Sequence, residues 1–233
     1  MSRITSQYSN GDYLSKNLNW HQEDSPYKSK LVIQMISKNN IGFQSCADIG
    51  CGAGLITEIL ADFYKDKDFI GYDLSQDVQH FWEDKKSKNL SFKNEDILVS
   101  KNLSDLIICL DVFEHIPNYY EFLLELNSLS KFYIFNIPLD MSVIKLITPG
   151  LKLAREKVGH LHYFNKYTAL KTLEDCNYEI LDYRLCTPIK SNKPRNKLQL
   201  LMLPIRLLSL ILGDQISSTL FGGYSLMVLA KTR

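Results

Sequence analysis

A glycine-rich turn between an apolar strand and an amphipathic helix constrains this chain more than any other stretch. Residues 46–54 read Cys-Ala-Asp-Ile-Gly-Cys-Gly-Ala-Gly, and apolar residues at helical spacing follow in 55–60. Glycine lets the backbone turn tightly and lets a ligand approach the main chain without meeting a Cβ atom. The N-terminus of the next helix offers unpaired N–H groups to a polar ligand. We therefore predict a ligand cradle here, with Asp48 placed to hold a positively charged group at the strand end.

Length, charge and cysteine content limit the classes of protein to consider. The 233 residues are enough for one large α/β domain, and 1–233 is treated as a single domain. A formal net charge of +1 gives no support for a nucleic-acid partner, which needs a concentrated basic surface. The five cysteines form no C-x-x-C pair and lie mostly in apolar runs, which predicts reduced thiols in the cytoplasm. The first residues lack the apolar stretch of a signal peptide.

Acidic residues follow the second and third predicted strands. Asp73 ends the strand 69–73 and lies 19 positions after Gly54. In nucleotide-binding βαβ units an acid at this spacing accepts hydrogen bonds from ribose hydroxyls. The alternative is that Asp73 caps a polar helix that we expect over 75–88. Asp96 follows a short strand, where its carboxylate would either meet a purine amino group or lie in a solvated loop.

Ionisable residues also follow the apolar run 105–110, which predicts a central strand. The next residues, 111–117, read Asp-Val-Phe-Glu-His-Ile-Pro. Ligands of open α/β sheets bind outside the carboxyl ends of the strands, so Asp111, Glu114 and His115 are placed for chemistry. The alternative is a helix N-terminal turn whose acids complement the helix dipole, with His115 as a packing residue.

Residues 139–165 form a long connection that we expect to be an active-site loop, because such connections in compact domains usually serve function. It contains His160 and His162, which would point the same way on an extended chain. Imidazole titrates near neutral pH, so a role as base or in substrate positioning is predicted. Satisfied structural histidines are the alternative. Two histidines alone do not support a zinc site.

The two ends of the chain carry further elements. Residues 1–30 look like an N-terminal arm or cap, which either staples onto the domain or folds over the ligand, before a helix from Leu31. Residues 190–221 are an apolar helical insertion before a last strand. Within it, 198–212 is too short and interrupted to span a membrane. It is either a core or dimer helix pair, or an interfacial helix that contacts the inner face of the membrane.

Taken together, these motifs resemble class I S-adenosylmethionine (SAM)-dependent methyltransferases. The match is to bacterial members with a Gly-x-Gly-x-Gly motif and an Asp-x-x-Glu-His turn after strand four, similar to the ubiquinone-pathway O-methyltransferase-like group. The resemblance implies a Rossmann-like α/β three-layer sandwich with a seven-stranded, mostly parallel sheet whose last strand is antiparallel. It also implies SAM as cofactor and methyl transfer to a small-molecule, glycan or lipid-linked acceptor, with oxygen as the expected target.

The resemblance assigns residues to roles. The glycines would cradle the methionine part of SAM, Asp73 would take the ribose hydroxyls, and Asp96 with Ile97 would meet the adenine. The full implied cofactor set is Asp48, Gly50, Cys51, Gly52, Gly54, Asp73, Leu74, Asp96, Ile97 and Leu110. The implied catalytic set is Asp111, Glu114, His115, His160 and His162. A similar turn in the ubiquinone-pathway enzymes is linked to a divalent metal, but no further ligand set is visible here, so no metal is expected.

Two other functions compete with this interpretation. An NAD(P)-dependent oxidoreductase also uses a glycine-rich βαβ unit with a ribose-binding acid, but its glycines run Gly-x-Gly-x-x-Gly. A SAM-binding protein without catalysis would keep the cradle alone. The intact acidic and histidine residues at 111–115 argue against such a loss.

Overall fold

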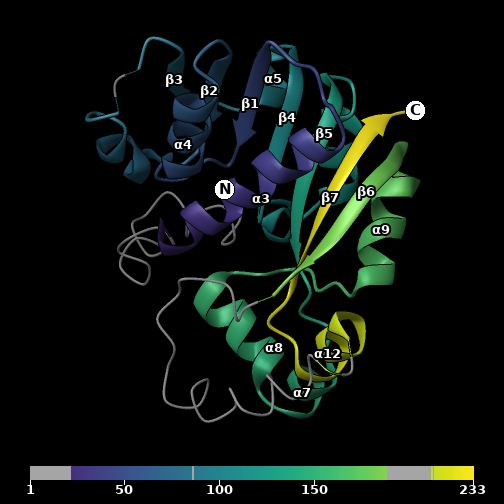
Figure 1. The fold of residues 1–233 in the computed structure, drawn as a ribbon. Coiled ribbons are helices and arrows are strands. Elements are labelled where there is room, and N and C mark those ends of the chain that lie inside the picture. Colours follow the sequence, from purple (N-terminus) through teal and green to yellow (C-terminus); the bar gives the residue numbers. More distant parts are fainter. Residues whose placement is uncertain (1–21, 86, 188–210, 212) are drawn as a thin grey trace.

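The computed structural model describes residues 22–85, 87–187, 211 and 213–233, and its centre is a seven-stranded sheet (Figure 1). The strand order is β3-β2-β1-β4-β5-β7-β6. Strand β7 is antiparallel to both neighbours, while the other pairs are parallel, so the predicted fold is confirmed. The strands are β1 (Ser45–Ile49), β2 (Asp68–Tyr72), β3 (Leu90–Lys93), β4 (Ser104–Leu110), β5 (Ser130–Pro138), β6 (Tyr178–Cys186) and β7 (Ser225–Thr232).

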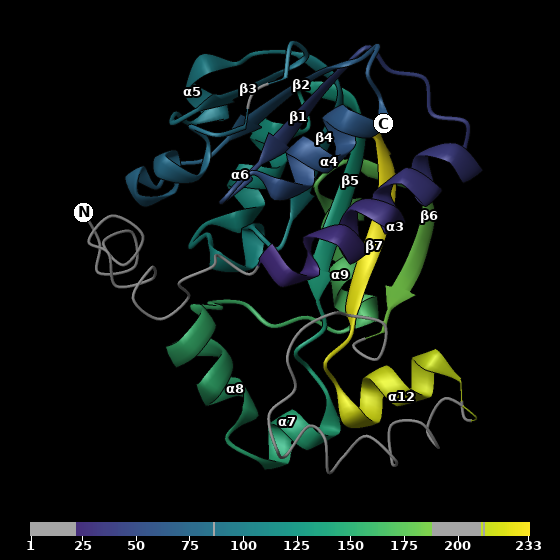
Figure 2. The same cartoon turned by 60° about the vertical axis from the view of Figure 1, so that its left-hand side comes forward.

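Helices cover both faces of this sheet and make it a three-layer sandwich (Figures 1 and 2). On one face, α3 (Ser25–Lys38) and α4 (Leu55–Phe63) bury apolar side chains such as Val32 and Leu60. On the other face, α5 (Ile97–Ser100), α6 (Tyr119–Leu126) and α9 (Lys166–Asp175) bury Ile97, Leu123 and Leu173. Burial on both faces explains why the central strands read as continuous apolar runs.

The sheet order reverses between β1 and β4. Chain connections leave β1 toward β2 on one side, whereas β4 pairs with the other edge of β1. In open α/β sheets a crevice forms at the carboxyl ends of the strands where the order reverses. The glycine-rich turn follows β1 and the 111–117 segment follows β4, so both predicted motifs lie at this crevice.

Two helices differ from the sequence predictions. Helix α3 begins at Ser25 rather than at Leu31, with a proline at its first turn, where a fixed φ favours helix initiation. The predicted arm is therefore helical from residue 25, and residues 1–21 lie outside the described residues. The predicted polar helix over 75–88 is only a short 3₁₀ helix, η2 (Gln76–Phe81). Its few apolar residues give a longer helix little surface to bury.

A group of short helices lies beyond the carboxyl ends of the parallel strands (Figures 1 and 2). The 139–165 connection folds into α7 (Val143–Ile147), α8 (Gly150–Leu153) and the π-helix η4 (Ala154–Val158). Helix α12 (Asp214–Phe221) packs against α7. Most of the predicted 190–221 insertion, including nearly all of 198–212, lies outside the described residues. Among the helices that are described, none combines the length and apolar character needed to cross a membrane.

Candidate active site

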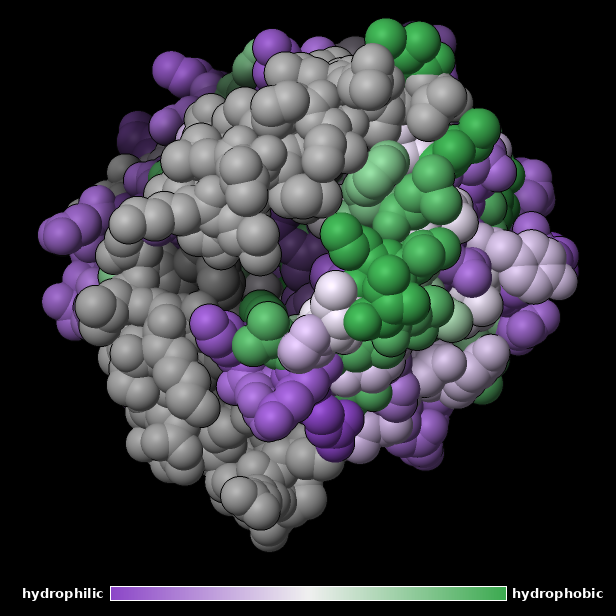
Figure 3. All heavy atoms as spheres, turned by 90° about the horizontal axis from the view of Figure 1, so that it is seen from below, coloured by the Kyte–Doolittle hydropathy of each residue, from purple (hydrophilic) through white to green (hydrophobic). Residues whose placement is uncertain are grey.

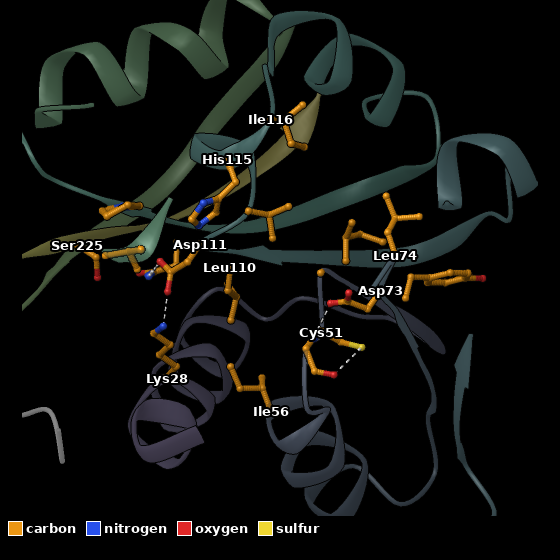
Figure 4. A pocket seen from close by; sticks show the side chains of 18 of the residues that line it. Lys28, Cys51, Ile56, Asp73, Leu74, Leu110, Asp111, His115, Ile116 and Ser225 are labelled. Carbon is orange, nitrogen blue, oxygen red and sulfur yellow. Dashed lines mark hydrogen bonds and ion pairs between the residues drawn. The ribbon is translucent and has the colours of Figure 1, made fainter. Parts of the chain in front are cut away.

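A cavity of about 1100 Å³ lies at the carboxyl ends of the central strands (Figure 4). Most of the predicted site residues line it together. They are Gly50, Cys51, Gly52, Gly54, Asp73, Leu74, Asp96, Ile97, Leu110, Asp111, His115 and His160. Asp48, Glu114 and His162 do not line it. In the view of Figure 4, Leu110 separates a half formed by Cys51 and Asp73 from a half formed by Lys28 and Asp111.

The glycine-rich turn needs its glycines for backbone reasons. Gly50, Gly52 and Gly54 have φ angles of 67°, 53° and 75°, in the left-handed region. A Cβ atom at Gly50 would lie 2.6 Å from the side chain of Val112. One at Gly54 would lie 2.5 Å from the ring of Phe92. The turn therefore exposes its main chain to the cavity and packs its other side too closely for a side chain.

Asp73 fastens this turn to the end of β2. Its Oδ2 accepts a hydrogen bond from the backbone N–H of Gly52 at 2.8 Å, and its Oδ1 accepts one from Ser75 N–H at 2.9 Å. Burial raises the pKa of Asp73, which lines the cavity. Asp73 thus anchors the backbone at Ser75 and also faces the cavity, while the residue that caps η2 is Ser75 itself and not Asp73. The ribose contact itself stays a prediction.

Asp96 starts helix α5. The backbone of Asp96 is extended, as is typical of an N-cap residue, and its side-chain Oδ1 accepts a hydrogen bond from Leu98 N–H at 2.9 Å. Asp96 and Ile97 both line the cavity on the β2–β3 side of the glycine turn. The cap fixes where the carboxylate lies, and its contact with adenine remains a prediction.

Asp48 is not placed to hold a ligand. Its side chain is buried, and Oδ2 accepts a hydrogen bond from Thr57 Oγ1 at 2.6 Å. The carboxyl group therefore ties β1 to α4 beneath the glycine turn. Burial raises the pKa of Asp48 to about 7. The sequence placed Asp48 at the strand end correctly, but it could not show that the side chain points into the core.

We expect Asp48 to make the unfolding free energy of the ligand-free protein depend on pH. The folded protein keeps the proton up to about pH 7, whereas the unfolded chain loses it near 3.8, so stability falls as pH rises between these values. Replacing Asp48 by asparagine removes this term. The free energy of unfolding of Asp48→Asn, relative to wild type, should rise by about 4 kcal/mol from pH 4 to pH 8.

Chemical denaturation over this pH range measures the difference. Asp105→Asn is a matched control because backbone hydrogen bonds lower the pKa of Asp105 below its usual value, so the stability difference between this variant and wild type should stay nearly constant from pH 4 to pH 8. Parallel stability profiles for Asp48→Asn and wild type would show that Asp48 titrates as an ordinary exposed acid.

The other half of the cavity is built around Asp111. Lys28, from the first turn of α3, forms an ion pair with Asp111, and Asn136 Nδ2 donates to Asp111 Oδ1 at 2.6 Å. An ionised carboxylate only accepts hydrogen bonds, which fixes the amide orientation of Asn136. Its Oδ1 is buried without a hydrogen-bond partner among the described residues. The sequence predictions missed Asn136, although its place near the end of β5 was a signal.

His160 is oriented by a carboxylate that the sequence analysis also missed. Its Nδ1 lies 2.5 Å from Asp140 Oδ2, and Lys145 forms an ion pair with the same aspartate. Asp140 follows β5 by two residues. The rule that singled out Asp73 and Asp111, an acid at the carboxyl end of a parallel strand, would have found it. The pair holds an imidazole at the cavity wall with its Nδ1 toward the acid.

The remaining histidines have different surroundings. His115 Nδ1 lies 3.1 Å from the carbonyl oxygen of Gly159, and its ring centre lies 4.9 Å from that of His160. His162 Nε2 lies 2.9 Å from Ile116 O, and its ring packs on Tyr119. His115 and His160 therefore share the cavity wall, while His162 connects its segment to the residues after β4.

Glu114 lies behind this wall. Its side chain is fully buried, and neither carboxyl oxygen has a hydrogen-bond partner in the described part of the chain. Burial and the nearby Asp111 raise the pKa of Glu114 well above its usual value. Ligand atoms of Glu114, His115 and His160 lie within 4.8 Å of one another, so these three could hold a metal ion. From the sequence, the only candidate metal ligands are in the 111–117 segment. The fold brings His160 next to them.

A family model described as a methyltransferase domain matches residues 19–183. The chain belongs to this methyltransferase family. The match covers both halves of the cavity, from Lys28 to Asp140 and His160, and it confirms the predicted class of enzyme. The finer likeness to the ubiquinone-pathway group is not established. No curated protein sequence gives a significant match.

Solved structures share the fold of this methyltransferase. Magnesium protoporphyrin IX methyltransferase from Synechocystis PCC 6803, with bound SAH, is 16% identical, with a TM-score of 0.57 over 100% of this chain and 89% of that one. The N-methyltransferase NodS from Bradyrhizobium japonicum WM9, also with S-adenosyl-L-homocysteine, is 15% identical, with a TM-score of 0.58 over 98% and 96%.

A putative methyltransferase in complex with the Haloferax volcanii Trm112 activator is 10% identical, with a TM-score of 0.66 over 98% of this chain and 97% of that one. At these identities the likeness shows the fold. Together with the family match it confirms SAM as the predicted cofactor.

Proposed function

We propose that this protein transfers a methyl group from SAM to a hydroxyl group of a small-molecule, glycan or lipid-linked acceptor. The observation that carries the proposal is one shared cavity, in which Cys51 and Asp73 lie on one side of Leu110, and Asp111 and His115 lie on the other (Figure 4). His160 lines the same cavity, and its ring lies beside that of His115. A donor held in the first half would present its reactive group to an acceptor held in the second.

The residues fit the parts of the cofactor. Gly50, Gly52 and Gly54 present main chain without side chains to the cavity, as a close-fitting ligand requires. Asp73 would accept hydrogen bonds from a ribose diol, since each of its oxygens has a second lone pair beyond its backbone contact. Asp96 and Ile97 would meet the adenine. When bound, SAM supplies a methyl group already activated by its sulfonium.

The protein then has two tasks, which are to align the acceptor and to take its proton. Alignment of two reacting groups contributes about 7–11 kcal/mol to a lowered barrier. Asp111, which Lys28 and Asn136 hold at the wall of this half, would accept a hydrogen bond from the acceptor. We assign the base to His160, because Asp140 holds its Nδ1 and so leaves Nε2 to take the proton. Asp140 is a positioning residue in this scheme.

Two measurements test the proposal. Titration calorimetry should show that SAM and its demethylated product bind, while NAD, the cofactor of the competing oxidoreductase function, does not. Incubation with methyl-labelled SAM and fractionated cell extract should then move the label into an acceptor fraction. Treatment of the labelled product with base distinguishes a methyl ether, which is stable and is the expected product, from a methyl ester, which is hydrolysed. Binding of SAM without transfer to any fraction would favour a SAM-binding protein without catalysis.

A further inference from the structure

The end of the molecule below the cavity carries a collection of exposed apolar side chains. We call the surface formed by α7, α8, η4 and α12 the α7–α12 face. Six of the sixteen large hydrophobic side chains exposed in the described residues belong to it, and Ile147 is 77% exposed. Figure 3, seen from this end, shows hydrophobic atoms gathered in one patch beside hydrophilic residues. The six are Val143, Leu146, Ile147, Leu153, Ile216 and Leu220.

These residues belong to one packed surface. Helix α7 packs against α8, which follows it directly in the chain, and against α12, which lies about seventy residues further along. At their junction, a Cβ atom on Gly222 would lie 2.4 Å from Ser142 Oγ, so the turn after α12 presses against the start of α7. Scattered exposed apolar residues are ordinary on a soluble protein, whereas a grouped set on a fixed surface indicates an interaction site.

The same face carries positive charge. Residues 150–158 contain exposed Lys152, Arg155 and Lys157 and one acid, Glu156, which pairs with Lys152 at 3.8 Å, and α12 adds the exposed acid Asp214. Lys145 of α7 adds no unpaired positive charge to this face, because it forms an ion pair with Asp140. Apolar side chains together with exposed cations on short surface helices are the pattern of elements that lie in the interface of an anionic membrane.

We propose that the α7–α12 face docks on an anionic lipid surface. A second copy of the chain fits less well, since a twofold contact through this face would bring the same cations together. The surface differs from the 198–212 segment of the sequence prediction, and none of its six apolar residues lies there. Docking does not depend on methyl transfer.

Docking would also bear on the acceptor, an inference that rests on the proposed function. The segment that forms α7, α8 and η4 continues into the cavity wall through Val158 and His160, and it begins with Asp140. A protein lying on this face would hold the acceptor half of the cavity near the lipid headgroups. Of the proposed acceptor classes, a lipid-linked one fits best.

Flotation with vesicles tests the proposal on the full-length protein. One set of vesicles contains phosphatidylglycerol and phosphatidylethanolamine, and the other contains phosphatidylcholine alone. We expect wild type to float with the anionic vesicles at least tenfold better than with the zwitterionic ones. The double variants Leu146→Ser/Ile147→Ser and Lys152→Glu/Arg155→Glu should each reduce flotation at least tenfold. Their thermal unfolding and SAM affinity, measured without vesicles, should match wild type.

A matched control removes apolar exposure elsewhere. Val99 and Leu103 are 82% and 75% exposed near α5, at the other end of the molecule in Figure 1, and the Val99→Ser/Leu103→Ser variant should float like wild type. The proposal is overturned if wild type stays unbound with anionic vesicles. It is equally overturned if the Leu146→Ser/Ile147→Ser variant floats as wild type does. If the wild-type protein does not bind SAM but does float with anionic vesicles, the proposed function is wrong and the docking proposal stands.

Discussion

Replacing Asp73 by alanine should lower SAM affinity at least tenfold while the protein stays folded. The carboxylate holds the N–H of Gly52, and it is the proposed partner of the ribose hydroxyls, so the variant loses both the shape of the turn and two acceptors for the ligand. Hydrogen bonds to a charged group contribute about 1.5–3 kcal/mol each, which agrees with a loss of this size. Titration calorimetry with SAM measures it.

Asp105 offers a matched control for this variant. Its Oδ2 also accepts two backbone hydrogen bonds, from Gln44 and Ser45, but at the amino end of β4, away from the cavity. Asp105→Ala should therefore lose a comparable local anchor and leave SAM affinity within about twofold of wild type. If folded Asp73→Ala binds SAM as tightly as wild type, the ribose contact is wrong and Asp73 only anchors the backbone at Ser75.

Replacing His160 by alanine should lower kcat by about 10²–10⁴-fold with little change in SAM affinity, in an assay with an identified acceptor. This range is what a positioned general base contributes. His160 lines the acceptor half of the cavity and is backed by Asp140, which explains why turnover should suffer and cofactor binding should not. His115→Ala should also lower turnover more than SAM binding, because its ring lies beside His160.

His162 is the matched control, from the same segment and two residues along. Its ring contacts Ile116 and Tyr119 and does not line the cavity, so His162→Ala should lower the melting temperature and leave kcat nearly unchanged. Full turnover in His160→Ala together with loss in His115→Ala would transfer the role of base to His115. Asp140→Asn should lower kcat while SAM affinity stays as in wild type, and recovery of kcat in Asp140→Glu would confirm the positioning role of Asp140.

Much of the cofactor half of the site could be predicted from local sequence. A run such as 46–54 carries its own geometry, because left-handed φ angles at Gly50, Gly52 and Gly54 are available to glycine at little cost. Asp73, the acid after β2, is likewise a local signal, since only one helix and one strand separate it from the glycine turn along the chain. The prediction that Asp48 holds a ligand is not supported. The residue pattern of the strand did not reveal that Thr57 of α4 would donate a hydrogen bond to this carboxyl group and cover it.

The acceptor half could be predicted only in part. Asp111 and His115 follow a recognisable strand, but Lys28 comes from α3, and Asn136 and Asp140 lie at and just after the end of β5. Nothing in the sequence near Lys28 says that the first turn of α3 reaches across to the end of β4. The 139–165 segment was rightly singled out, yet only its packing shows that His160 and not His162 reaches the cavity.

The sequence by itself determined the order of the strands along the chain, the glycine turn and the acid that fastens it, because these depend on neighbours within about one supersecondary unit. The tertiary structure alone decided which histidine meets which acid, that Lys28 reaches Asp111, and that α7 and α12 form one surface. The physical reason is distance along the chain. Such contacts exist only after the sheet has brought separate segments to one edge, and no local periodicity records them.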